Sequence, residues 1–140
     1  MIAVADFARA RCRISLDGGV WSAERDATLF RVDGEKAMLP FVACLEEDAR
    51  EVQAALRKGL ERAGLSPELE ASFPYAAIAD VGLSMSAYWI DRALDWIEVV
   101  GASPTIRSRL EEIVAAKRGT QRQRQRARRL LRQGPARPRA

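Results

Sequence analysis

The apolar residues of this chain change their spacing partway along it, and this change constrains the fold more than any other feature. Between residues 9 and 16, Ala10, Cys12, Ile14 and Leu16 alternate with polar residues. A period of two places them on one face of a β-strand. After residue 44 the apolar residues recur every three or four positions, which is the spacing of one face of a helix. The sequence therefore predicts an α+β fold, with a small antiparallel sheet followed by a helical part.

Turn signals divide the first part of the chain into a β-meander over about 9–42. The segments 17–19 (Asp-Gly-Gly) and 33–34 (Asp-Gly) contain glycines, which adopt the positive φ angles that tight hairpins need. Pro40 ends the pattern, because proline cannot donate a backbone hydrogen bond to a neighbouring strand. The predicted strands cover 9–16, 20–24, 28–32 and 35–39.

Helices are predicted over about 44–118, and the first of them, over 44–63, has the clearest pattern. Its single apolar stripe consists of Leu45, Ala49, Val52, Leu56, Leu60 and Ala63. Three acidic residues at 46–48 suit the first turn of a helix, where the backbone dipole favours negative charge. Gly64 is a suitable residue to end this helix.

A second predicted helix, over 84–100, is apolar on almost every side. Its polar residues are confined to one narrow strip, which consists of Asp91, Arg92, Asp95 and Glu98. A helix of this kind lies in a core or at an interface. Met85, Trp89 and Trp96 share one face, so they are predicted either as core residues or as the anchors of a homodimer or partner contact.

Two further helices follow. Ser103-Pro104 forms an N-cap and first-turn pair for a helix that ends near Gly119, and Thr120 caps a last helix over 121–133. Residues 134–140 are rich in proline and arginine and are predicted to be disordered. The predicted organisation is one α+β domain over 1–118 and a basic helical tail over 119–140.

Charge is distributed very unevenly between these parts. Residues 1–116 contain 13 basic and 19 acidic residues, a net charge of −6. Residues 117–140 contain 10 basic residues and no acidic residue, a net charge of +10. An acidic body with a basic tail is typical of a protein whose tail interacts with a partner.

The tail is the principal candidate binding site. Six arginines lie within 121–132, namely Arg122, Arg124, Arg126, Arg128, Arg129 and Arg132. Guanidinium groups bind phosphate oxygens in a bidentate manner, so this composition suits nucleic acid or another polyanion. No aromatic residue lies among them to stack on bases, so binding is expected to be independent of sequence. The alternatives are that the tail docks on the acidic body or lies on a membrane surface.

The acidic strip has its own alternatives. Asp91, Asp95 and Glu98 are spaced to face the same way on a helix. Carboxylates of this kind could hold Mg²⁺ or Ca²⁺, could receive the arginine tail or a basic partner, or could simply face solvent. Solvent exposure is the simplest interpretation, and no bound metal is predicted.

The composition argues against an enzyme and against a cofactor. The chain contains no histidine, which is the commonest general base, and it has no phosphate-binding loop, dinucleotide fingerprint or Cys-x-x-Cys motif. Cys12 and Cys44 are predicted to be small buried apolar residues. No apolar run is long enough to span a membrane, and no secretory signal is recognisable, so a cytoplasmic location is expected.

Two functions remain open at this stage. The first is a small non-enzymatic protein whose arginine tail binds nucleic acid or another polyanion. The second is a protein-interaction module, such as a homodimer or an accessory or immunity-like protein, that uses the apolar helix 84–100. In the second case the tail covers its own acidic strip.

Overall fold

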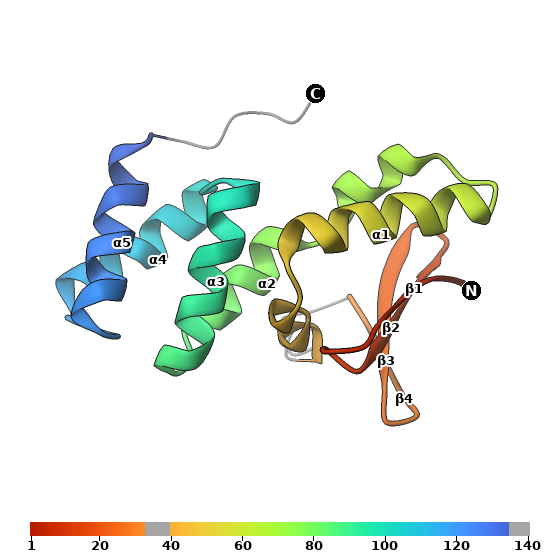
Figure 1. The fold of residues 1–140 in the computed structure, drawn as a ribbon, viewed down its shortest axis with the longest axis horizontal. Coiled ribbons are helices and arrows are strands. Elements are labelled where there is room, and N and C mark those ends of the chain that lie inside the picture. Colours follow the sequence, from red (N-terminus) through yellow and green to blue (C-terminus); the bar gives the residue numbers. More distant parts are fainter. Residues whose placement is uncertain (33–39, 135–140) are drawn as a thin grey trace. The chain divides into compact units, whose positions relative to one another are not determined.

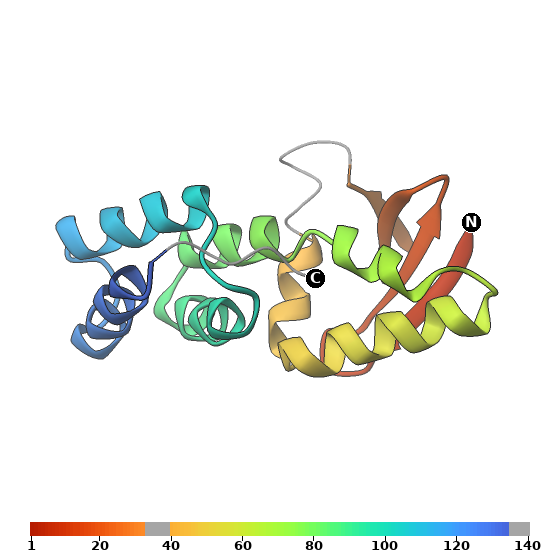
Figure 2. The same ribbon diagram turned by 90° about the horizontal axis from the view of Figure 1, so that it is seen from above.

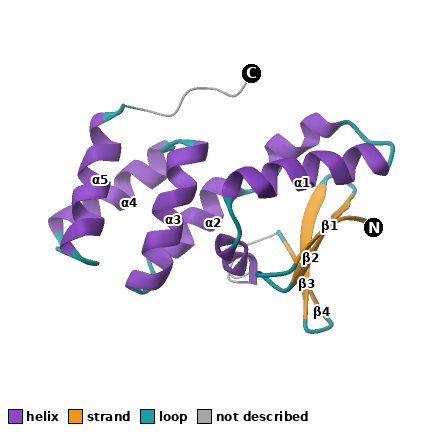
Figure 3. Cartoon of the chain, in the orientation of Figure 1, coloured by secondary structure: helices purple, strands orange, loops and turns teal. Residues whose placement is uncertain are grey.

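A four-stranded antiparallel sheet at the N-terminus is followed by helices, which confirms the predicted α+β fold (Figures 1 and 3). The computed structural model describes residues 1–32 and 40–134. The strand predicted over 35–39 and the disorder predicted after Gly134 concern residues outside these ranges. The chain divides into two compact units, Met1–Pro74 and Tyr75–Ala140.

The sheet has the simple order β1-β2-β3-β4. In the hairpin between β2 and β3, Gly18 and Gly19 have φ angles of +57° and +83°, as the turn signal predicted. The sheet begins earlier than expected, because its first strand lies before residue 9. The alternating pattern did not reveal that strand, since its residues 2–5 are all apolar and a bulge between Ala3 and Ala5 breaks its register with β2. The strands are β1 (Ile2–Phe7), β2 (Cys12–Asp17), β3 (Val20–Arg25) and β4 (Thr28–Arg31).

The helix predicted over 44–63 is divided in two. Residues Pro40–Glu46 form a 3₁₀ helix, η2, and the α-helix α1 covers Ala49–Arg62. The prediction placed the helix start too early because Leu45 continues the apolar stripe and is buried in η2. Asp48 determines the true start, since its carboxylate accepts hydrogen bonds from the backbone N–H groups of Arg50 and Glu51.

The core of the first unit lies between the sheet and α1, which Figure 2 shows side by side. Val52, Leu56 and Leu60 of the predicted stripe are fully buried. A short 3₁₀ helix, η3 (Pro67–Ser72), also packs on α1 and begins after Ser66, whose hydroxyl accepts a hydrogen bond from the backbone N–H of Glu68. The Trp21 indole N–H donates a hydrogen bond of 2.9 Å to Ser72 Oγ, which connects η3 to the sheet.

The second unit contains only helices within the described residues. They are α2 (Tyr75–Leu83), α3 (Ala87–Val100), α4 (Pro104–Ala115) and α5 (Gln121–Arg132). The predicted caps of α4 and α5 are confirmed, because the Ser103 and Thr120 hydroxyls accept hydrogen bonds from the backbone N–H groups of Ile106 and Gln123. Helix α3 begins at Ala87 and not at 84, and Gly101 ends it as expected.

Helix α3 carries apolar side chains on most of its sides because it packs against two neighbours in this unit, α2 and α5. Its buried residues are Ile90, Ala93, Leu94, Trp96 and Ile97. The Trp96 ring packs against Tyr75 of α2 with ring centroids 5.8 Å apart. Half of the ten apolar residues of α3 are buried, and the other five are partly or fully exposed.

Candidate functional site

The side chains on the inner face of α5 fix the orientation of this helix about its own axis. Ala127, Leu130 and Gln123 are buried, and α5 packs against both α3 and α4. The Gln123 side chain is the central polar contact. Its amide nitrogen donates to the Ala87 carbonyl at 2.7 Å and to Asp91 at 3.0 Å, while its oxygen accepts the Thr120 backbone N–H. This arrangement decides which arginines of α5 face the protein and which face solvent.

Arg126 is directed at the acidic strip of α3. Its guanidinium lies 2.7 Å from Asp95, 3.1 Å from Glu98 and 3.8 Å from Asp91, and its side chain is only 16% exposed. Burial lowers the pKa of Arg126, but the hydrogen bonds that its guanidinium donates to Asp95 and Glu98, together with the negative charges of these carboxylates, outweigh this effect and raise the pKa above the ordinary arginine value. The docking of the tail on Asp91, Asp95 and Glu98, one of the sequence-based alternatives, is therefore present at this arginine.

Arg124 also faces its own unit. One nitrogen of its guanidinium donates to the Gly119 carbonyl at 2.8 Å and lies 3.4 Å from the Lys117 carbonyl, just beyond the end of α4. Arg107 does the same at the end of α5, where it donates to the carbonyls of Leu131 and Gly134. Arg107 thus satisfies a carbonyl group of the last turn of α5, which the end of a helix leaves without a partner, whereas Arg124 bonds carbonyl groups of the loop between α4 and α5.

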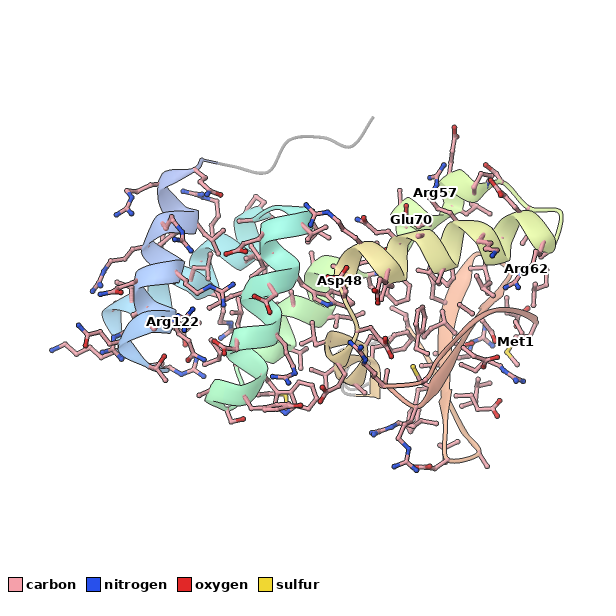
Figure 4. All side chains as sticks on the ribbon, in the orientation of Figure 1. Met1, Asp48, Arg57, Arg62, Glu70 and Arg122 are labelled. Atoms are coloured by element: carbon pink, nitrogen blue, oxygen red, sulfur yellow. The ribbon has the colours of Figure 1, made fainter. Side chains whose placement is uncertain are left out.

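The outward face of α5 carries the remaining positive charge. Its exposed arginines are Arg122, Arg128, Arg129 and Arg132. At 100° per residue these four side chains fall within about one third of the helix circumference, and Figure 4 labels Arg122 on this helix. Within the part of the chain that the structure describes, Arg129 is the only one of the four that forms an ion pair, with Glu98 at 3.7 Å. We call these four residues the basic face.

A groove of about 680 Å³ lies along the basic face, between α5 and the acidic strip. Its lining consists of Asp95, Glu98, Arg122, Gln125, Arg126, Arg128, Arg129 and Arg132. The lining is almost entirely polar, so the groove suits a charged and hydrated ligand better than an apolar one.

The contacts of the acidic strip distinguish between the alternatives predicted for it, namely a metal ion, the arginine tail or a basic partner, and solvent. Asp91, Asp95 and Glu98 surround a guanidinium, so the three carboxylates neutralise Arg126. Within residues 1–32 and 40–134 no group of three acidic or cysteine side chains is arranged to hold a metal ion.

The predicted aromatic interaction surface is different in the structure. Trp96 is 1% exposed and belongs to the core, so it is not a surface residue, whereas Met85 and Trp89 are half-buried. Tyr88, which no sequence pattern marked as an interaction residue, is 49% exposed and packs edge-on against Trp89 with centroids 5.1 Å apart. The Arg92 guanidinium lies 3.5 Å from the centre of the Tyr88 ring.

The two cysteines lie together in the first unit. Both are buried, as predicted. Their pairing was not predicted: Cys12 Sγ of β2 and Cys44 Sγ of η2 are 3.8 Å apart, although 32 positions separate them in the sequence.

Comparisons of the chain with protein families, with curated proteins and with solved structures found no match. Among the described residues no helix has the length and apolar character that crossing a membrane requires. Inferences about function therefore depend on the residues and contacts described above.

Proposed function

We propose that this protein is a small non-enzymatic polyanion-binding protein, and that the basic face of α5 binds the phosphate backbone of nucleic acid without sequence specificity. The observation that carries this proposal is the orientation of α5 about its own axis, which determines the direction in which each of its arginines points. Arg126, which pairs with acidic residues, and Arg124, which bonds a carbonyl of the loop before α5, face the unit, while four arginines remain on the solvent side.

The charge of the surrounding unit supports this proposal. Residues 75–140 contain 13 basic and 6 acidic residues, a net charge of +7, whereas residues 1–74 contain 10 basic and 13 acidic residues, a net charge of −3. A polyanion is attracted to the unit that carries the basic face and repelled by the other. Arginine suits phosphate because its planar group donates two parallel hydrogen bonds.

The absence of aromatic residues from α5 supports a backbone-directed mode of binding. Residues 121–132 contain no Phe, Tyr or Trp, so the helix offers no ring on which a base could stack. Contacts from arginine to phosphate position a protein on nucleic acid but carry no sequence information. The proposed ligand is therefore recognised by its charge and spacing.

The test replaces three residues of the basic face by glutamine in one variant: Arg122→Gln, Arg128→Gln and Arg132→Gln. Fluorescence anisotropy with a labelled duplex of mixed sequence should show at least about a tenfold loss of affinity at low salt, because three phosphate contacts are removed. The circular dichroism spectrum should not change, since these three side chains are exposed.

A matched control removes the same charge elsewhere. Arg50, Lys58 and Arg62 are exposed cations of α1, and replacing all three by glutamine should weaken binding by less than about threefold, the small effect expected of net charge alone. Equal losses in both triple variants would reject the basic face as the binding site, and so would a wild-type protein that does not bind.

A second candidate function is protein interaction through the start of α3, favoured by the exposure of Tyr88 beside Trp89 and Arg92. Tyrosine, tryptophan and arginine are the residues most enriched at interaction hot spots. If this surface mediates self-association, sedimentation at micromolar concentration will show a species larger than 15.5 kDa, and Tyr88→Ser will reduce it. A monomer at all concentrations would remove self-association from consideration.

A further inference from the structure

The buried cysteines have the proximity that a reversible disulfide needs. Their sulfur atoms are 3.8 Å apart and in hydrogen-bond contact. A disulfide requires about 2.05 Å between the sulfurs, so formation of the bond requires an approach of somewhat less than 2 Å. Both cysteines are free thiols in the structure.

The surroundings hold the two cysteine-bearing segments in place. Glu47, which directly follows η2, accepts backbone hydrogen bonds from Arg9 at 2.7 Å and Ala10 at 3.0 Å, in the turn that precedes β2. These bonds fix the end of η2 against the start of β2, where Cys12 lies. The short distance between the sulfurs is therefore supported by neighbouring backbone contacts and does not depend on the two side chains alone.

The two sulfurs differ in their access to solvent. A surface pocket of about 400 Å³ is lined by Asp6, Phe7, Ala8, Arg11, Cys12, Arg13 and Glu24. Cys12 thus borders a space that a small oxidant can enter, whereas Cys44 is fully buried and lines neither this pocket nor the groove along α5. This difference in access suits a pair in which the oxidant reacts with the sulfur of Cys12, and the sulfur of Cys44 then reacts with the oxidised Cys12.

The protonation of the pair follows the same asymmetry. The hydrogen bond from the Cys44 thiol lowers the pKa of Cys12, and Arg25 adds to this effect, although burial and the carboxylates of Glu47 and Asp6 oppose it. The same hydrogen bond and burial raise the pKa of Cys44. The thiolate, which is the reactive form, is therefore favoured on the accessible cysteine, and the proton remains on the buried one.

We propose that Cys12 and Cys44 form a redox-sensitive site that a peroxide converts into an intramolecular disulfide. In the first step the Cys12 thiolate attacks one oxygen of hydrogen peroxide, the O–O bond breaks, and Cys12 sulfenic acid and hydroxide form. In the second step Cys44 sulfur attacks Cys12 sulfur, the S–O bond breaks, and water leaves with the thiol proton. Two electrons pass from the thiols to the peroxide, and a dithiol reductant reverses the change.

The test uses the full-length protein, reduced and then exposed to a small molar excess of hydrogen peroxide. The two free thiols should disappear together, and the intact mass should fall by about 2 Da, the mass of two thiol hydrogens. Digestion with trypsin without reduction should yield Cys12-Arg13 linked to the peptide that contains Cys44. Two remaining thiols, or a disulfide between two chains, would overturn the proposal.

Serine variants determine the order of the two steps. In Cys44→Ser the sulfenic acid on Cys12 has no partner, so dimedone should label the oxidised protein at Cys12. In Cys12→Ser the remaining sulfur is buried, and the folded protein should stay unlabelled under the same conditions. Labelling of Cys12→Ser but not of Cys44→Ser would contradict the assignment of Cys12 as the residue that meets the peroxide.

Discussion

Gly59 lies where α1 comes closest to the sheet. A Cβ atom built on this residue would overlap the carbonyl oxygen of Val4 and lie 2.7 Å from the carbonyl carbon. Both atoms belong to the backbone of β1, so a rotamer change cannot relieve the contact. The close approach of α1 to β1 therefore requires a residue without a side chain.

Gly59→Ala should destabilise the protein, although alanine is the better helix former. In an exposed helix this change is worth about 1 kcal/mol in favour of alanine. Here the overlap with Val4 must push α1 away from the sheet, and overpacking of this kind costs roughly 1–3 kcal/mol. Urea denaturation should show a lower free energy of unfolding, while Ala54→Gly, at an exposed position of α1, should show only the loss of helix propensity. A more stable Gly59→Ala variant would contradict the close approach.

Individual residues also mark the limit of what sequence can predict. The alternating pattern was sufficient to predict that Cys12 is buried, because the pattern depends only on near neighbours in the chain. The contact between Cys12 and Cys44 depends on how η2 packs on the sheet, and no local pattern contains that information. Trp96 shows the same limit, since its spacing from Trp89 fitted a core residue and an interface anchor equally well, and the structure buries it.

At the scale of elements, α5 is held in place by the ion pairs of Arg126 as well as by its buried apolar side chains. Arg126→Gln should remove the ion pairs with Asp95 and Glu98 and leave three carboxylates near one another. The carboxylates are 43% to 68% exposed, so the loss should be about 1 kcal/mol, near the upper value for exposed ion pairs.

Amide exchange gives the measurement that separates this contact from general charge effects. Arg126→Gln should exchange faster along α5 than the wild-type protein, because local opening of this helix becomes easier. Arg128→Gln removes the same charge from the exposed face and should leave exchange in α5 unchanged. Equal protection in the two variants would show that Arg126 does not hold the helix.

The elements with strong local signals were predicted well, and those without them were not. The caps predicted at Ser103 and Thr120 were correct because each depends on a hydroxyl and the backbone within three residues. Helix α2 was missed because its apolar residues lack a clear stripe. The different roles of the arginines of α5 could not be predicted either, because they follow from the rotation of α5 against α3.

At the scale of the whole molecule, positive charge belongs to residues 75–140 and negative charge to residues 1–74, with nets of +7 and −3. When charge is counted along the chain alone, this division falls at residue 117. The compact unit that contains α5 also contains the acidic strip, so part of the positive charge of the tail is neutralised within its own unit. The charge that remains for a ligand is smaller than the +10 of residues 117–140 suggests.

The salt dependence of binding measures this remaining charge directly. If only the basic face contacts phosphates, four contacts with duplex DNA give a slope of about −3.6 in a plot of log affinity against log salt concentration, since each contributes roughly 0.9. Arg122→Gln should reduce the slope by nearly one contact, whereas Arg124→Gln should leave it unchanged because Arg124 is used at the end of α4. Duplexes of unrelated sequence should give the same slope and affinity. A slope near −5, or one that Arg124→Gln reduces as much as Arg122→Gln does, would mean that the inward arginines also reach the ligand and that α5 leaves its place on α3 when it binds.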